Sequence, residues 1–254
     1  MRLDSAAAAA GVRLIVHDVI GSTNAEALRL ARAGERGPLW VVARMQTAGR
    51  GRRGRGWVSQ PGNLFATLLL HAPSPPAQAP QLSFVAAVAL TDALSACAPA
   101  CAEALTLKWP NDVLLGGAKV AGVLIEAEGD SVAIGMGVNC LSHPPDTEFP
   151  AADLSAFAVD ADAVFAALSA AMAQRLAQWD RGTGFAAIHA AWLGRAHGLG
   201  QTIRVRLPER ELSGRFDGVD EAGRLLLHRS DGTVEAITAG DVFGFDSAAR
   251  QAEH

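Results

Sequence analysis

GRGRRGRGW, residues 49–57, is the stretch that most narrows the choice of fold. Five arginines, at positions 44, 50, 52, 53 and 55, fall within twelve residues, and no acidic residue occurs between Pro38 and Thr91. Arginine presents a planar fork of donors suited to carboxylates and phosphates, and glycine lets backbone N–H groups approach an anion. Taken alone, the segment also fits a solvated basic loop. We favour an anion-binding loop.

Residues 49–54 also match the dinucleotide-binding pattern GxGxxG and follow a predicted strand, residues 38–45. In a Rossmann fold this pattern opens a helix, and an acidic residue follows about 20 positions later. Here the chain runs through Trp57 and Pro61 into another predicted strand, residues 63–71, without such an acid. We treat the Rossmann match as accidental, which makes a dinucleotide oxidoreductase the least favoured alternative.

Outward from the loop, strand and helix patterns are mixed as in an α+β fold. Strands are predicted at 12–17, 38–45, 63–71, 105–108, 119–128 and 131–139, and helices at 25–33, 82–97, 160–179 and 185–195. After Gly200 the pattern changes to short strands at 202–207, 211–217, 224–229 and 233–237, which suggests a small β-barrel or sandwich. We therefore predict two domains, residues 1–197 and 198–254.

Three further motifs carry candidate site residues. Asn111 and Asp112 of KWPND, residues 108–112, have the chemistry to bind a nucleotide or a magnesium ion, and an ordinary turn is an equal alternative. Lys119 in GAKVAGVLIE is either an exposed strand end or a group that stabilises charge at a reacting phosphate. In GMGVN, residues 135–139, glycines within a strand suggest close approach of backbone or ligand.

From the amino-acid composition we expect a globular protein of the cytoplasm. Half of the 254 residues are hydrophobic, and the net charge of -4 argues against general binding to duplex DNA. The three cysteines do not form a disulfide framework, and we expect them to be buried hydrophobic residues. Neither a secretion signal nor an uncharged stretch of membrane-spanning length is apparent, so we expect no membrane partner.

Taken in order, GSTN, QTAGRGRRGRGW, KWPND, GAKVAGVLIE and GMGVN resemble the catalytic domain of biotin protein ligases. The resemblance spans roughly residues 12 to 246 and is specific as a set. It implies a fold like the catalytic domain of class II aminoacyl-tRNA synthetases, with a mixed β-sheet, flanking helices and a C-terminal SH3-like β-barrel. It also implies formation of biotinyl-5'-AMP from biotin and ATP with Mg²⁺, followed by transfer to a lysine of a biotin carboxyl carrier protein.

The resemblance assigns roles to individual residues. It places biotin against Ser22, Thr23, Asn24, Gln46, Gly49, Arg50, Gly51, Arg52, Lys119 and Gly122. It places ATP against Arg55, Trp57, Lys108, Asn111, Asp112 and Asn139. Lys119, Arg52 and Arg50 are the expected catalytic residues, and metal ligands other than the nucleotide are not assigned. A basic residue precedes the tryptophan in some members, whereas Gly56 stands here, and we expect activity to survive this difference.

Sequence features disfavour each of the alternative functions. A lipoate ligase shares the fold and the adenylation chemistry but would carry a different arginine and glycine motif. A nucleic-acid-binding module is opposed by the acidic net charge and by the lack of aromatic residues between the arginines. Because the chain starts about eleven residues before the first catalytic strand, we expect a ligase without a DNA-binding domain or repressor function. Whether it acts as a monomer or a homodimer stays open.

Overall fold

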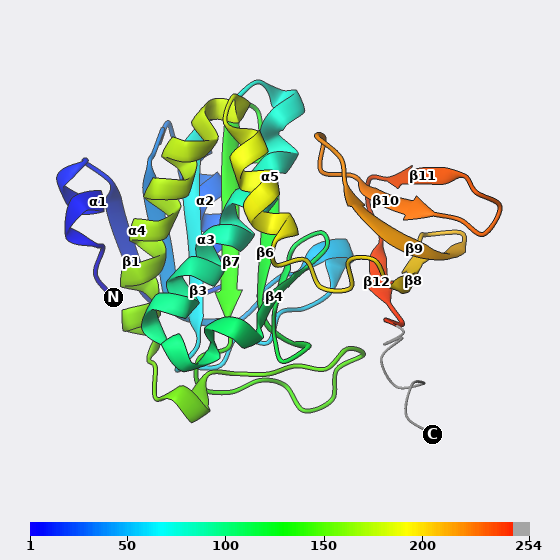
Figure 1. The fold of residues 1–254 in the computed structure, drawn as a ribbon. Coiled ribbons are helices and arrows are strands. Elements are labelled where there is room, and N and C mark those ends of the chain that lie inside the picture. Colours follow the sequence, from blue (N-terminus) through cyan, green and yellow to red (C-terminus); the bar gives the residue numbers. More distant parts are fainter. Residues whose placement is uncertain (246–254) are drawn as a thin grey trace.

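A seven-stranded mixed sheet organises the larger part of the computed structural model, which describes residues 1–245 (Figure 1). Its spatial order is β1-β2-β3-β7-β6-β5-β4; β1 and β2 are parallel, and the other neighbours are antiparallel. The strands are β1 (Arg13–Ile20), β2 (Leu39–Gln46), β3 (Leu64–His71), β4 (Leu105–Lys108), β5 (Asp112–Leu115), β6 (Ala118–Glu128) and β7 (Ser131–Val138). This sheet confirms the expected α+β class.

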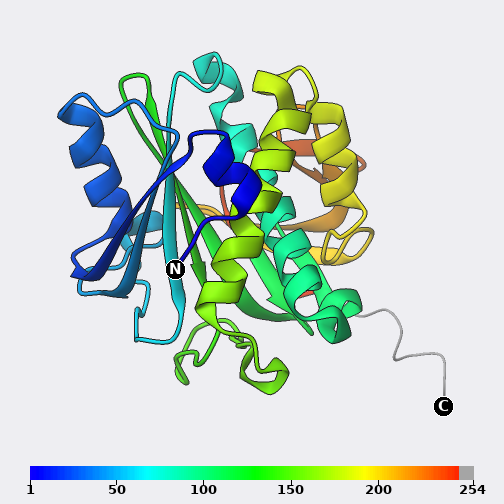
Figure 2. The same cartoon turned by 90° about the vertical axis from the view of Figure 1, so that its left-hand side faces the viewer.

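Helices cover the two faces of the sheet unequally. α2 (Thr23–Arg32) packs on one face, while α3 (Leu82–Cys97), α4 (Ala161–Trp179) and α5 (Phe185–Leu193) pack on the other (Figure 2). The short α1 (Ser5–Ala9), built from the alanine run and capped by Asp4, lies beside α4. Strand alternation produces this arrangement, because neighbouring residues of a strand face opposite sides of a sheet.

Strand β2 shows the alternation clearly. Leu39 and Val41 belong to the small cluster under α2, whereas Trp40 and Val42 belong to the main core under α3 and α4. Trp40 meets Phe165 of α4 edge-on, with ring centroids 5.4 Å apart. Full burial of large apolar side chains of this kind contributes about 1.5–3 kcal/mol each, so this face carries most of the stability.

Residues 76–97, which include α3, are long and apolar enough to span a membrane by composition. In the structure 61% of their most apolar window is buried against the sheet, α4 and α5. The high hydropathy of this segment therefore reflects a core helix that is covered on several sides.

A five-stranded antiparallel sheet follows in the C-terminal part, in the order β11-β10-β9-β8-β12. Its strands are β8 (Thr202–Arg206), β9 (Glu211–Val219), β10 (Leu225–His228), β11 (Val234–Ile237) and β12 (Asp241–Phe243). It docks on the larger unit, where Trp109 Nε1 donates a 2.9 Å hydrogen bond to the Gly223 carbonyl. The domain boundary at residue 197 remains a prediction, and the tail at 246–254 lies outside the described residues.

The sequence did not predict β5 and β12. Both are very short, four and three residues, and both lie in stretches rich in turn-forming residues. Their pairing partners define them: β5 is held between β4 and β6, and β12 pairs with β8. The first residues of these two strands, Asp112 and Asp241, belong to the site described next.

Candidate active site

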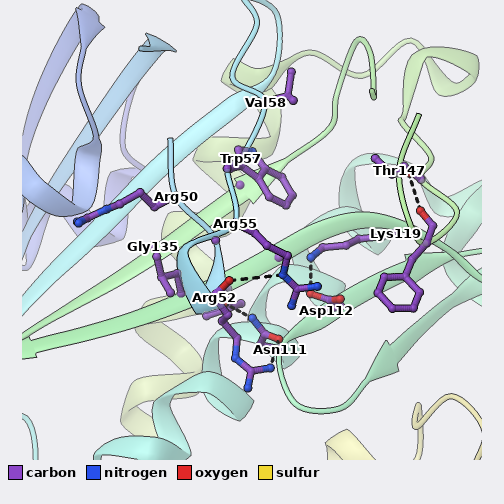
Figure 3. A pocket seen from close by; sticks show the side chains of 18 of the residues that line it. Arg50, Arg52, Arg55, Trp57, Val58, Asn111, Asp112, Lys119, Gly135 and Thr147 are labelled. Atoms are coloured by element: carbon purple, nitrogen blue, oxygen red, sulfur yellow. Dashed lines mark hydrogen bonds and ion pairs between the residues drawn. The ribbon is translucent and has the colours of Figure 1, made fainter. Parts of the chain in front are cut away.

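One cavity of about 400 Å³ opens on the α2 face of the sheet, beside the N-terminus of that helix (Figure 3). Of the residues expected at the site, it is lined by Ser22, Thr23, Asn24, Gln46, Arg50, Gly51, Arg52, Arg55, Trp57, Lys108, Asn111, Asp112, Lys119, Gly122 and Asn139. The structure thus brings together segments that are up to 117 residues apart, Ser22 to Asn139. A volume of this size suits a small-molecule site.

Gly49 is the expected site residue that does not line this cavity. A Cβ atom at position 49 would lie 2.5 Å from both Ser59 Oγ and the Trp57 carbonyl oxygen. The backbone of Gly49 also accepts a 2.9 Å hydrogen bond from the Trp57 amide. Gly49 therefore closes the base of the loop, which explains why a glycine is needed there.

The cavity floor consists of small residues on one face of two paired strands. In β7, Ile134, Met136 and Val138 enter the main core, whereas Gly135 and Gly137 alternate onto the α2 face. Gly122 of β6 pairs with Gly137 and shares that face. Side chains from other elements fill the space above the glycines: a Cβ at Gly135 would lie 2.3 Å from Asn24 Oδ1. One at Gly137 would lie 2.6 Å from the Trp57 ring.

Replacing Gly137 by alanine is expected to displace Trp57 and to raise by about tenfold the KM for ATP, the ligand that the sequence resemblance assigns to Trp57, since small misplacements of binding groups are costly. The strand backbone should persist, because the added methyl meets a side chain and not the main chain. Steady-state kinetics measures the effect. The matched control is Gly21→Ala, whose Cβ would meet nothing within 4 Å. Equal KM values in the two variants would contradict the role given to the Trp57 position.

A network of hydrogen bonds holds one end of the cavity. Thr67, fully buried in β3, donates to Asn24 Oδ1 at 2.6 Å, and Asn24 Nδ2 donates to Glu126 at 2.8 Å. The backbone amide of Thr23 donates to Gln46 Oε1 at 2.8 Å. Ser22 caps α2 by accepting a hydrogen bond from the Ala25 amide. Thr23, Asn24, Gln46 and Thr67 are neutral, and the charged member, Glu126, lies outside the cavity lining and pairs with Arg50, so this end of the cavity suits a polar ligand group without charge.

Acidic residues remote in sequence neutralise much of the arginine loop. Glu126 pairs with Arg50 at 3.1 Å, and Asp241 pairs with Arg53 at 3.1 Å and with Arg55 at 2.8 Å. Although no acidic residue lies between residues 38 and 91 in the sequence, the folded loop therefore has acidic partners. Tertiary structure decides which of its arginines remain available to a ligand.

Two cations in the cavity have no carboxylate partner within residues 1–245: Arg52 and Lys108. Arg52 donates to Asn111 Oδ1 at 3.3 Å, and Lys108 Nζ lies 4.2 Å from the centre of the Phe149 ring. Burial is the main cause that lowers the pKa of both side chains, because it disfavours the charged form. An anionic ligand would offset this desolvation, so the electrostatics favours carboxylate or phosphate binding.

Lys119 lies at the centre of the cavity, close to a carboxylate and an aromatic ring (Figure 3). Its Nζ is 2.6 Å from Asp112 Oδ1 and 5.2 Å from the centre of the Trp57 ring. The Lys119 ammonium therefore partners Asp112 Oδ1, whereas the indole N–H of Trp57 has no hydrogen-bond partner in the described chain. Buried polar atoms without partners are uncommon in native proteins. The Trp57 N–H is therefore positioned for a group that a ligand would bring.

Asn139 is held by the protein itself. Its Nδ2 donates to the Ala152 carbonyl at 3.0 Å, which joins the end of β7 to the chain that follows. Its buried side chain thus fixes the cavity wall.

Besides Val58 and Phe65, two segments that line the cavity lie outside all the predicted motifs. One is the connection after β7, which contributes Pro144, Asp146, Thr147, Glu148, Phe149 and Ala151. Its proline-rich composition, with Pro144, Pro145 and Pro150 soon after Asn139, is a signal that could have identified it as a binding loop. The other is Gly240, Asp241 and Val242 of the C-terminal part. No local pattern identifies these residues, because only tertiary structure places β12 beside the arginine loop.

Two family models match this chain and define the class of protein to which it belongs. Residues 16–141 match the biotin/lipoate A/B protein ligase family, and residues 198–243 match the biotin protein ligase C-terminal domain. The class of the chain is thus that of the biotin and lipoate protein ligases.

The relatives narrow this class. The biotin–[acetyl-CoA-carboxylase] ligase of Paracoccus denitrificans is 46% identical, with 87% of this chain and 96% of that protein covered. The enzyme of that name from Mycobacterium tuberculosis is 33% identical, with 87% and 85% covered. The biotin protein ligase of Aquifex aeolicus in complex with biotin and ATP superposes with a TM-score of 0.78 at 27% identity, covering 91% of this chain and 97% of that one. The chain belongs to the biotin protein ligase family.

Proposed function

We propose that this chain activates biotin with ATP and transfers it to a lysine of a biotin carboxyl carrier protein. In the first half-reaction a carboxylate oxygen of biotin attacks the α-phosphorus of ATP, forming biotinyl-5'-AMP and releasing pyrophosphate. In the second, the lysine amine attacks the acyl carbon, an amide forms, a proton leaves the amine and AMP departs. The observation that carries the proposal is a pair of cations without a carboxylate partner in the described chain, half-buried Arg52 and buried Lys108, beside Lys119.

The cavity supplies the two ends that this reaction needs. The neutral end at Ser22, Thr23, Asn24 and Gln46 suits the uncharged ureido ring of biotin. The cationic part suits the carboxylate and the phosphates, whose mutual repulsion opposes the first step. Lys119, Arg52 and Arg50 are the proposed catalytic residues, with Lys119 and Arg52 offsetting negative charge where it develops. Arg55, Trp57, Lys108, Asn111, Asp112 and Asn139 form the proposed ATP side.

A magnesium ion bound with ATP fits the donors present. Mg²⁺ is typically held by substrate phosphates and one or two carboxylates, and it assists the departure of pyrophosphate by neutralising charge. The Asp112 carboxylate, which lines the cavity, would hold it, with Asn111 beside it. In residues 1–245 no group of three acidic, histidine or cysteine residues forms a separate metal site.

Acetyl-CoA carboxylase is the proposed source of the acceptor, on the strength of the relatives from Paracoccus and Mycobacterium named for it. We place the reaction in the cytoplasm, where ATP is available. The three cysteines are unpaired in the structure, as expected for a reducing compartment.

The proposal predicts ATP–pyrophosphate exchange that depends on biotin. The assay follows incorporation of labelled pyrophosphate into ATP with biotin, with lipoate, or without an added acid. We expect exchange with biotin alone, because the neutral end of the cavity matches a ureido ring and offers nothing specific to a dithiolane. Exchange with lipoate in place of biotin would indicate a lipoate ligase, which shares the fold and the adenylation chemistry. Exchange with neither acid would contradict adenylation chemistry altogether.

A further inference from the structure

Asp241 is the first residue of β12, and it reaches from the C-terminal sheet to the arginine loop. Its two carboxylate oxygens serve different arginines: Oδ1 lies 2.8 Å from Arg55 Nη2, and Oδ2 lies 3.1 Å from Arg53 Nη1. The carboxylate is 13% exposed and lines the cavity. One side chain thus joins both arginines from a part of the chain more than 180 residues away.

The loop needs such a partner for two physical reasons. Arg52, Arg53 and Arg55 place three like charges within four residues, and their repulsion favours a spread loop. In addition, Arg53 has a φ of 55°, in the left-handed region that side chains other than glycine rarely adopt. The turn at Arg52–Gly54 is therefore strained, and surrounding contacts must maintain it. The double ion pair to Asp241 is such a contact.

The C-terminal sheet also contacts the second cavity loop. Arg206 of β8, which pairs in register with Asp241, forms an ion pair with Glu148 in the connection after β7. The Arg206 guanidinium also stacks on Phe243, with 4.8 Å from its central carbon to the ring centre. Two neighbouring residues of this sheet edge thus hold the two loops that enclose one side of the cavity.

We propose that Asp241 is a positioning residue for ATP, through which the C-terminal sheet holds Arg55 in the geometry that receives the triphosphate. The inference rests on the proposed adenylation function and extends it. Asp241 contacts arginines and not the reacting atoms, so it acts through Arg55. The neutral end of the cavity lies on α2 and β2, away from Asp241. The loop arginines expected against biotin have other partners, Glu126 for Arg50 and Asn111 for Arg52, so Asp241 should affect biotin binding much less than ATP binding.

The test is the variant Asp241→Asn, which keeps the shape and removes the charge. We expect the KM for ATP to rise about tenfold, as misplacement of a positioning group commonly does. The KM for biotin should stay within about twofold, and so should the rate of biotin transfer from added biotinyl-AMP to the carrier protein. Asp241→Glu should recover part of the ATP affinity. A KM for ATP that is unchanged or lower would overturn the proposal, because a lower value would mean that Asp241 competes with phosphate.

A matched control exists in the same sheet. Glu235 of β11 likewise bridges two arginines, Arg210 at 2.6 Å and Arg229 at 3.2 Å, but lies outside the cavity. Glu235→Gln should leave all three kinetic values unchanged. If it matches Asp241→Asn, the effect belongs to the stability of the sheet and the proposal is wrong.

A second measurement does not depend on activity. In the protein without substrates, trypsin should cleave after residues 53 and 55 faster in Asp241→Asn than in Glu235→Gln. Equal cleavage would overturn the role of Asp241 in holding the loop. If the unmodified protein shows no biotin-dependent exchange, the proposed function is refuted. Failure of the proposed function can thereby be told apart from failure of the role given to Asp241.

Discussion

Replacing Lys119 by alanine is expected to lower biotin-dependent ATP–pyrophosphate exchange by roughly 10²- to 10³-fold, the usual cost of losing a group that stabilises transition-state charge. Lys119 is central in the cavity, and its ammonium lies 2.6 Å from Asp112 and over the Trp57 ring. Attack of one anion on another concentrates negative charge where Lys119, Arg52 and Lys108 converge. Most of the loss should therefore appear in kcat.

A double variant separates this role from a simpler one. Lys119→Ala leaves the Asp112 carboxylate without its ion-pair partner, and that charge alone would repel phosphates. In Lys119→Ala combined with Asp112→Asn the stray charge is gone. If Lys119 acts on the substrates, the double variant stays as slow as the single one or becomes slower. Recovery to within a few-fold of the unmodified rate would show that Lys119 serves only to neutralise Asp112.

Where local pattern determines structure, the sequence predicts this protein well. Helix 82–97 was predicted with the bounds of α3, because its apolar residues recur at helical spacing and no glycine interrupts it. The glycines of GMGVN indicated close approach within a strand, and Gly135 and Gly137 do lie against Asn24 and Trp57. The motifs that resemble biotin protein ligases likewise converge on one cavity, apart from Gly49.

The sequence fails where the partner of a residue is distant. The acid-free neighbourhood of the arginine loop suggested five available cations, but Asp241, Glu126 and Asp18 pair with four of them. Strand β12, which carries Asp241, has only three residues and no alternation long enough to detect. Pairing across more than 180 residues depends on how two sheets dock, and no spacing rule contains that information.

The distinction between paired and unpaired arginines leads to a second large effect. Arg52→Gln is expected to reduce exchange by about 10²-fold, because it removes a half-buried cation of the cavity that we propose to act on the reacting anions. Arg53→Gln, its neighbour, should cost only a few-fold, because Arg53 is exposed, already paired with Asp241 and outside the cavity lining. The two variants change the loop charge equally. Their exchange rates, measured at saturating ATP and biotin with thermal unfolding as a check, therefore isolate position from charge. Equal losses would mean that the loop acts through its total charge, and Arg52 would lose its proposed catalytic role.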